Sequence, residues 1–428
     1  MDCFRIEGGR RLEGRTRVSG SKNASLPLLA AALLVDGTVR LRGVPRLRDT
    51  DTLLELLAGL GVRWRRSGAR DLRLEADPGG PTEAPYAVVR RMRASVCVLG
   101  PLLARRGRAR VALPGGCVLG PRPIDLHLRG MEALGAEVRI EHGTIVAEAP
   151  AGGLRGARVR LAGERGTTVL GTINVLFAAC IARGRTVLEA AAQEPEVVAV
   201  GEFLNACGAR IEGLGGPTLE VEGVEGLGGA ETVVPPDRIE AGTLLLAGAI
   251  SGGRVRVEGC RPAECGPLLS LLAASGVEVA VGPDWFECRP WRRPPRAQGL
   301  VTRPYPGFPT DLQAQWMAFS CRCAGVARIR EGVYPERFVH AAELVRMGAR
   351  IQIGEGEARV EGPVRLQGAE VLASDLRASA ALVLAALAAE GTTVVRRVYH
   401  LDRGYERLEE KLNALGAAVT RRPDPDAP

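Results

Sequence analysis

The stretch LHLRGMEALGAEVRI, from Leu126 to Ile140, joins an amphipathic run to an alternating segment through Gly135. The first part has the apolar spacing of a helix, and the last part has the alternation of a strand. A glycine at such a junction supplies the left-handed backbone conformation that ends a helix. The same helix–glycine–strand signature occurs in six copies. They are Leu53–Arg66, Leu126–Ile140, Val200–Glu212, Leu268–Val281, His340–Ile353 and Leu408–Arg421.

These copies recur at a nearly constant interval of 68 to 74 residues, measured between their glycines. A second signature, an apolar helix closed by glycine and followed by a β-branched strand, alternates with the first. Its glycines are Gly37, Gly107, Gly184, Gly253, Gly325 and Gly391. Such a regular step argues against chance in a chain with 55 glycines. We therefore predict an α/β protein of six similar units with two helices each, three units to a domain, packed around buried helices.

The length of 428 residues favours two domains over one. A proline pair at Val233–Pro236 interrupts the pattern between the third and fourth copies and marks the expected boundary. A first strand, Phe4–Val18, precedes the first unit and is expected to join the C-terminal half. The predicted domains are 1–21 together with 236–428, and 22–235, and we expect the site in the cleft between them.

The composition narrows the class of protein. The chain is 46% hydrophobic and 25% charged, as in an ordinary globular protein. It shows neither a signal peptide nor an apolar run long enough to span a membrane, so we expect a cytoplasmic protein without a membrane partner. The ten cysteines follow no regular spacing, so we expect reduced thiols and no metal site.

The chain carries a formal net charge of +8, with its basic residues spread along the whole sequence and only 4% aromatics. Such a charge fits a nucleic acid, an acidic membrane surface or an anionic small substrate, and its distribution argues against the nucleic acid. Among the 57 basic residues only Lys22 and Lys411 are lysine.

Lys22 lies in the small-residue turn Val18–Pro27, just before a long apolar run. Turn amides, a helix N-terminus and an ammonium group would together favour an anion. The alternative is a solvent-exposed lysine in a loop.

Cys117 is embedded in the glycine- and proline-rich segment Leu113–Asp125, five residues before Arg122. Such a segment is typical of a loop that closes over substrates, and a nearby guanidinium would lower the pKa of the thiol. Most cysteines are instead buried and inert, as we expect for Cys97, Cys180 and Cys207.

Asp311 follows the proline-rich stretch Arg303–Pro309 and is a candidate general base toward a hydroxyl group. The alternative is that Thr310 or Asp311 caps the next helix. Three further polar clusters, Pro236–Glu240, Ser374–Ser379 and His400–Tyr405, are either helix caps with internal ion pairs or arginine clamps for carboxylate and phosphate groups.

Together these segments resemble the UDP-N-acetylglucosamine 1-carboxyvinyltransferase family, essentially from end to end. The matching motifs are Ser19–Ala24, Met92–Ser95, Pro114–Cys117, Arg122–His127, Phe308–Asp311, Asp375–Ser379 and Asp402–Glu406. The resemblance implies a pair of inside-out α/β barrel domains. It also implies transfer of the enolpyruvyl group of phosphoenolpyruvate to UDP-N-acetylglucosamine, the first committed step of peptidoglycan synthesis and the target of fosfomycin.

The resemblance also implies roles for individual residues. Lys22, Arg93, Arg122, Arg337 and Arg403 would hold phosphoenolpyruvate. Arg122, Pro123, Ile124, Asp125 and His127 would line the uridine pocket. Asn23 and Asp311 would contact the amino sugar, with Asp311 near the attacking 3-hydroxyl, and Val333 and Tyr334 would lie along the nucleotide sugar. Cys117 would be the acid and the point of covalent attachment, so the expected catalytic set is Cys117, Asp311, Lys22 and Arg403. Asp375 and Arg377 complete the expected substrate-binding set.

The implied mechanism needs no metal or organic cofactor, and its partners are phosphoenolpyruvate and UDP-N-acetylglucosamine. One departure concerns the acceptor: many relatives have Ser-Val-Gly-Ala-Thr where this chain has Thr168-Val169-Leu170-Gly171-Thr172. The hydroxyls at both ends would still suit a diphosphate, but Leu170 replaces a glycine. The alternatives are a sister transferase acting on shikimate 3-phosphate or on a uridine nucleotide such as UMP, a nucleic-acid-binding protein, and a regulatory relative without turnover.

Overall fold

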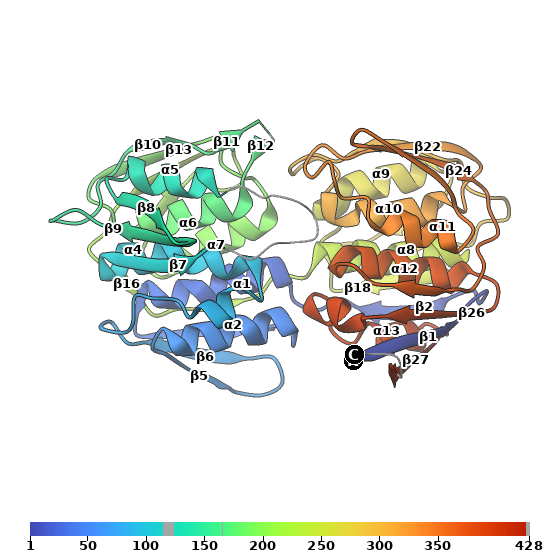
Figure 1. Cartoon of the computed structure of the whole chain (residues 1–428), viewed down its shortest axis with the longest axis horizontal. Helices are drawn as coiled ribbons and strands as arrows, with labels where there is room; N and C mark the ends of the chain where they lie inside the picture. Colours follow the sequence, from blue (N-terminus) through green and yellow to red (C-terminus); the bar gives the residue numbers. More distant parts are fainter. Residues whose placement is uncertain (114–123, 165, 425–428) are drawn as a thin grey trace. The chain divides into compact units, whose positions relative to one another are not determined.

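A computed structural model describes residues 1–113, 124–164 and 166–424. The chain divides into two compact units (Figure 1). The N-terminal unit is Gly20–Pro235, and the C-terminal unit combines Met1–Ser19 with Pro236–Pro428. Among the described residues, no helix is both long and apolar enough to cross a membrane.

The N-terminal unit has three main sheets. The first sheet has the strand order β17 (Glu231–Val233), β4 (Thr38–Arg42), β6 (Leu72–Ala76) and β5 (Val62–Arg66). The second has the order β7 (Arg108–Ala112), β9 (Thr144–Glu148) and β8 (Glu137–Glu141). The third has the order β10 (Arg158–Arg160), β13 (Arg185–Glu189), β15 (Thr218–Glu222) and β14 (Arg210–Glu212). Two short pairs are β3 (Val35–Asp36) with β16 (Leu227–Gly228), and β11 (Ala162–Gly163) with β12 (Gly166–Thr167).

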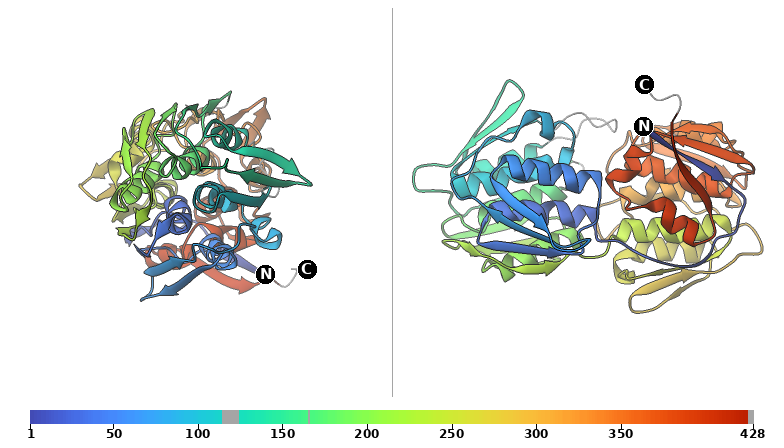
Figure 2. Two further views of the ribbon diagram at one scale, coloured as in Figure 1. Left: turned by 90° about the vertical axis from the view of Figure 1, so that its left-hand side faces the viewer. Right: turned by 90° about the horizontal axis from the view of Figure 1, so that it is seen from below.

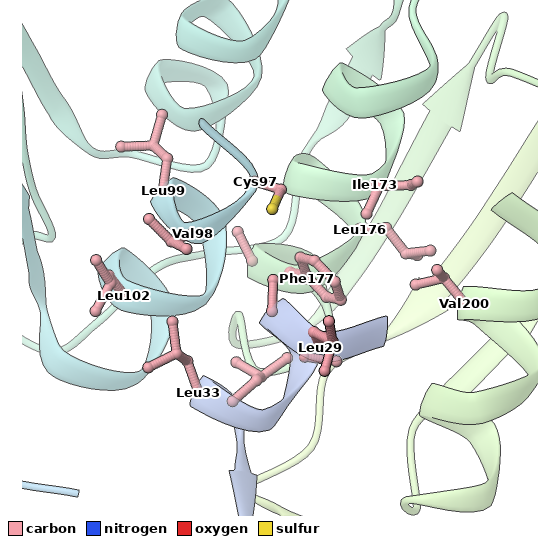
Figure 3. Close-up of a cluster of buried hydrophobic side chains, with 14 of the residues drawn as sticks. Leu29, Leu33, Cys97, Val98, Leu99, Leu102, Ile173, Leu176, Phe177 and Val200 are labelled. Carbon is pink, nitrogen blue, oxygen red and sulfur yellow. The ribbon is translucent and has the colours of Figure 1, made fainter. Parts of the chain in front are cut away.

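The helices of this unit pack into one apolar core. They are α1 (Lys22–Ala30), η1 (Ala31–Leu33), α2 (Arg48–Gly59), α3 (Tyr86–Val89), η2 (Arg93–Val98), α4 (Leu99–Arg106), α5 (Asp125–Ala133), α6 (Val169–Ala179) and α7 (Pro195–Ala206). Figure 3 shows part of this core, where Leu29 of α1, Leu102 of α4 and Phe177 of α6 lie in one cluster of buried side chains. Every residue of α6 from Gly171 to Ala179 is buried, so this mostly apolar helix lies inside the unit.

The C-terminal unit repeats the arrangement. Its first sheet has the strand order β25 (Glu370–Leu372), β26 (Thr392–Arg396), β1 (Asp2–Glu7) and β27 (Ala418–Pro423). The second has the order β19 (Val279–Val281), β20 (Trp285–Cys288), β18 (Arg254–Glu258) and β2 (Glu13–Arg17). The third has the order β21 (Leu300–Val301), β22 (Gly325–Arg330), β24 (Glu357–Gly362) and β23 (Arg350–Gly354). Its helices are α8 (Arg238–Ser251), η3 (Pro262–Cys265), α9 (Gly266–Ala274), η4 (Thr310–Leu312), α10 (Gln313–Ser320), α11 (His340–Arg346), α12 (Leu376–Ala388), η5 (Val398–Arg403) and α13 (Leu408–Ala414). Helices α8, α10 and α12 are buried along nearly their whole length, with strands around them (Figure 1).

The six sheets share one connectivity. In each four-stranded sheet an edge strand pairs in parallel with its neighbour, and the other pairs are antiparallel, as in β10 with β13 and β21 with β22. The three-stranded sheet has the same parallel contact as a single bridge between Glu83 and Arg110. The prediction of six similar α/β units, three in each unit of the fold, is therefore confirmed.

The marker glycines explain why the pattern is visible in the sequence. The six glycines of the first signature, Gly61 to Gly416, have φ between +83° and +103°, a region that side-chain-bearing residues avoid. Five glycines of the second signature also have positive φ. The exception is Gly253: the helix ends one residue earlier, at Gly252 with φ +67°. Gly253 is instead pressed against Leu12, whose carbonyl oxygen would lie 2.0 Å from an added Cβ.

The prediction of a single first strand at Phe4–Val18 was wrong, because this segment forms two strands that belong to two different sheets. β1 lies between β26 and β27, and β2 pairs in parallel with β18. Figure 2 shows β1, dark blue, beside the red β27 of the C-terminal unit. The chain between them, at Gly8 and Gly9, donates backbone hydrogen bonds to Gly391 and Leu387 at the end of α12.

Candidate active site

Lys22 is the first residue of α1 and is half-buried. Ser21 caps the helix by accepting a hydrogen bond from the Ala24 amide at 3.2 Å. The Lys22 Nζ atom lies 2.7 Å from the Oδ2 atom of buried Asp49, on α2. The lysine is therefore an ion-paired cation at a helix N-terminus, where the helix dipole favours an anion, and not a free loop lysine. Asn23, next to it, is half-buried.

A buried asparagine that the sequence analysis missed fixes the state of His127. Asn174, on α6, accepts from the Gly100 amide at 2.9 Å through Oδ1 and donates to the Val96 carbonyl at 2.9 Å through Nδ2. These two backbone partners set the orientation of the amide, so Nδ2 is also the donor at 3.0 Å to the Nδ1 atom of His127. The proton of the neutral ring is therefore on Nε2.

Burial, together with the positive charge of Arg93, lowers the pKa of His127 to about 4. At neutral pH the ring is uncharged, and its Nε2–H group is a hydrogen-bond donor. Arg93 begins η2, the turn whose Val96 carbonyl is held by Asn174. One buried amide thus connects Arg93 and His127, two of the residues expected to bind substrates.

The first turn of α6 is built by threonines. Thr168 caps the helix, with its hydroxyl accepting from the Gly171 amide at 3.2 Å. The Thr172 hydroxyl is buried, donates to the Thr168 carbonyl at 2.7 Å and accepts from the Ala192 amide at 3.1 Å. The Thr172 hydroxyl is therefore engaged by the protein backbone, and the expectation that both hydroxyls serve a diphosphate stays a prediction. Val169 and Leu170 are half-buried against the core.

Three predicted residues, Cys117, Arg122 and Pro123, lie outside the described residues. Ile124 is buried, whereas Asp125 is exposed and forms a 3.8 Å ion pair with Arg129. The other nine cysteines are buried and free, and burial raises the pKa of each of their thiols. Within the described residues, no group of three or more histidine, cysteine or acidic side chains is placed to hold a metal ion.

Asp311 in the C-terminal unit is held between two buried arginines. Its Oδ1 accepts from the Arg337 Nη1 atom at 2.9 Å, and its Oδ2 accepts from the Arg377 Nη2 atom at 3.1 Å. The side chain of Asp311 is 26% exposed, against 6% and 2% for the two arginines. Neither η4 nor α10 has a side-chain capping hydrogen bond, so the capping alternative for Thr310 and Asp311 is wrong.

The arginines are firmly cationic. Burial opposes the charge of Arg337 and Arg377, but their neighbours together outweigh it and raise the pKa of both. Asp311 makes the largest favourable contribution to each, joined by Asp375 at Arg337 and by Tyr405 and Asp237 at Arg377. Arg377 also lies over the ring of buried Tyr405, at 5.4 Å from its centroid. The Tyr405 hydroxyl is in turn hydrogen-bonded to Thr243 at 2.9 Å and to Gln315 at 3.1 Å.

Asp375 has the capping role that Asp311 lacks. Its Oδ1 accepts from the Arg377 amide at 2.8 Å and the Ala378 amide at 3.0 Å, at the start of α12. It thereby fixes the helix end from which the Arg377 side chain extends. Nearby His340 is buried, and burial with the charge of Arg337 lowers its pKa to about 4 despite the opposing effect of Asp375.

Two further elements carry predicted residues. Arg403 ends η5 and is half-buried; burial, together with the charge of Arg403, lowers the pKa of His400 to about 4. Val333 and Tyr334 are half-buried, and both of their amides donate to Glu331. Sequence reasoning missed Glu331, since an acidic residue after a strand gives no sign of partners distant in sequence.

Two grooves on the sheets of the N-terminal unit contain none of the predicted site residues. One of about 390 Å³ is lined by several arginines of β4, β5 and β6. Most of them are paired on the same surface: Arg42 with Glu231 at 2.8 Å, Arg66 with Asp51 at 3.1 Å and Arg73 with Glu75 at 2.7 Å. We therefore assign this groove to surface ion pairing.

Comparison with known proteins identifies the family and the fold. The family model for EPSP synthase (3-phosphoshikimate 1-carboxyvinyltransferase) matches residues 6–412. The chain belongs to the EPSP synthase family. Among solved structures, the enolpyruvyl transferase NikO from Streptomyces tendae is 29% identical, with a TM-score of 0.89 over 99% of both chains.

Two structures of EPSP synthase from Acinetobacter baumannii are each 18% identical. They have TM-scores of 0.74, over 99% of this chain and 100% of the other, and 0.73, over 98% and 99%. At this identity they show the shared fold alone. Membership in the EPSP synthase family establishes the enolpyruvyl transferase fold and a transferase that uses phosphoenolpyruvate. The sequence resemblance was narrower, because it named one acceptor branch.

Proposed function

We propose that the protein transfers the enolpyruvyl group of phosphoenolpyruvate to the 3-hydroxyl of UDP-N-acetylglucosamine, releasing phosphate. The observation that carries this proposal is the Asp311 carboxylate, held by two buried arginines yet partly open to solvent. Each carboxylate oxygen has a second lone pair, so Asp311 can still accept a hydrogen bond from a substrate hydroxyl. That is the geometry expected of a proton acceptor whose position is fixed before the substrate binds.

In the proposed reaction the acceptor oxygen bonds to C2 of phosphoenolpyruvate while C3 gains a proton. The resulting tetrahedral ketal then loses phosphate by breaking the bond between C2 and the phosphate oxygen, while C3 returns a proton to the group that donated it and the C2–C3 double bond forms again. Asp311 takes the hydroxyl proton, and Cys117 is the proposed acid at C3. Lys22, Arg93, Arg122, Arg337 and Arg403 are proposed to hold the anionic donor, and a cationic clamp of this kind stabilises the departing phosphate.

The state of His127 supports a uridine acceptor. The Nε2–H donor left by Asn174 suits a carbonyl oxygen, of which the uracil ring has two. We propose that His127 lines the uridine pocket with Arg122, Pro123, Ile124 and Asp125. Asn23, Val333, Asp375 and Arg377 complete the proposed substrate contacts. With this acceptor the enzyme would supply peptidoglycan synthesis.

One observation favours a second acceptor, a uridine nucleotide without the sugar, such as UMP. Leu170 is half-buried in the first turn of α6, and the Thr172 hydroxyl is used within the protein. A diphosphate would then depend mainly on Thr168, Val169 and the backbone amides at the helix start. This is a smaller set of contacts than the sequence implied.

The test is phosphate release from phosphoenolpyruvate with UDP-N-acetylglucosamine, UMP and shikimate 3-phosphate as separate acceptors. Release with the nucleotide sugar alone supports the main proposal. Preferential release with UMP supports the second, and release with shikimate 3-phosphate alone rejects both.

A further inference from the structure

Glu331 is a buried carboxylate, 3% exposed, that joins three segments of the C-terminal unit. It directly follows β22. Its Oε1 accepts from the Thr302 hydroxyl at 2.5 Å, the Val333 amide at 2.9 Å and the Tyr334 amide at 3.0 Å. Its Oε2 accepts from the Thr310 hydroxyl at 3.0 Å. Within the described part of the chain, no basic side chain pairs with it. Because burying a carboxylate without a cation is costly, its position calls for an explanation.

The Oε2 contact leads directly to Asp311. Arg337 Nη1 donates to both the Thr310 hydroxyl and the Asp311 Oδ1 atom, each at 2.9 Å. A threonine hydroxyl has one proton to donate. Since Thr310 gives that proton to Glu331, its lone pairs face Arg337. The carboxylate therefore sets the direction of the hydroxyl that holds the guanidinium beside Asp311.

We propose that Glu331 is a positioning residue for enolpyruvyl transfer, acting on Asp311 through Thr310 and Arg337. This role rests on the proposed function of Asp311 as proton acceptor. At the same time Glu331 fixes the turn at Val333 and Tyr334. The two tasks fall on different oxygens of one carboxylate, and this separation allows them to be tested apart.

Glu331→Gln separates the two tasks. Three donors converge on Oε1 and one on Oε2, so the glutamine keeps its oxygen toward the backbone amides and turns its NH₂ group toward Thr310. The turn is then retained, but the Thr310 hydroxyl must accept from residue 331, and its own proton is directed elsewhere, in competition with Arg337. A misplaced Asp311 is expected to lower kcat about tenfold, with little change in KM for phosphoenolpyruvate.

The experiment measures kcat and KM for phosphate release in the wild type, Glu331→Gln, Thr310→Val and the double variant. Glu336→Gln is the matched control, because Glu336 is exposed in the same segment. If Glu331 acts through Thr310, the double variant is no slower than Thr310→Val alone, a non-additivity that independent sites do not show. Effects that multiply, or a kcat for Glu331→Gln equal to that of Glu336→Gln, overturn the positioning role.

Two further outcomes are separated by design. A wild type that releases no phosphate with any acceptor overturns the proposed function and the positioning role with it, whereas an active wild type tests Glu331 alone. If Glu331→Gln does not fold, Thr310→Ser and Thr310→Val decide the matter. The serine keeps the hydroxyl and should retain the wild-type kcat, while the valine should lose about tenfold. Equal rates for these two variants reject the relay.

Discussion

Replacing Asp311 by asparagine should reduce both turnover and stability. Sequence reasoning alone predicts a loss of turnover with an intact fold. The structure adds a second effect, because Asp311 is the shared partner of Arg337 and Arg377, whose side chains are only 6% and 2% exposed. Asparagine offers an oxygen to one guanidinium and an NH₂ group to the other, so one buried arginine faces a donor.

The magnitude follows from the burial of the two arginines. Removing one member of a buried ion pair costs about 3–5 kcal/mol, and the partial exposure of Asp311 reduces this to about 2–4 kcal/mol. In a domain of roughly 200 residues this corresponds to a fall of about 5–15 °C in Tm for the C-terminal unit. Turnover should fall at least about a hundredfold, the scale for losing a positioned proton acceptor.

The assay is thermal unfolding by circular dichroism, with phosphate release measured on the same samples. Asp402→Asn is the matched control, since Asp402 pairs with Arg421 at 2.6 Å but both side chains are about a quarter exposed. It should cost no more than about 1 kcal/mol. An Asp311→Asn variant as stable as Asp402→Asn would refute the reasoning about the buried pair, and near-normal turnover would refute the catalytic role.

Three further predictions concern other buried groups. The free energy of unfolding should fall as the pH drops from 6.5 toward 4, because the pKa of His127 and of His340 is about 4 in the folded protein and these histidines are protonated first in the unfolded chain. Each histidine should lower the free energy of unfolding by about 1–2 kcal/mol at pH 5. Urea midpoints measured across this pH range should fall less steeply for His340→Gln than for the wild type. Asn174→Ala should cost about 2–4 kcal/mol, because it leaves three buried polar partners unsatisfied, and a urea midpoint equal to that of the wild type would contradict this. Fosfomycin should alkylate Cys117 alone, since the nine described thiols are buried; peptide mass mapping checks this, and an adduct on any other cysteine would count against it.

The fold was predictable because it repeats a local signal. Each copy ends a helix at a glycine with positive φ, and that requirement is visible in the sequence without any distant contact. The division of Phe4–Val18 into two strands was not visible, because β1 and β2 pair with strands from the other end of the chain. The position of Gly253 was misjudged for a similar reason, since its constraint comes from the Leu12 backbone.

The site residues could be predicted where they are neighbours in the sequence, and less well where they meet only through contacts between distant segments. The segment around Asp311 marked a candidate, but only the structure shows that two distant arginines, not a helix end, hold it. Asn174 in an apolar helix and Glu331 after a strand went unnoticed, because a single polar residue does not reveal partners that are distant in sequence. For Asp375 the local interpretation as a helix cap was sufficient.

The most direct test of the central proposal compares two acceptors at equal subsaturating concentrations. Phosphate release from phosphoenolpyruvate is measured with UDP-N-acetylglucosamine and with UMP. The proposal predicts rapid release with the nucleotide sugar and negligible release with UMP, because the diphosphate and amino sugar supply the binding energy that is used in the transition state. Faster release with UMP would contradict the main proposal and establish the second acceptor in its place.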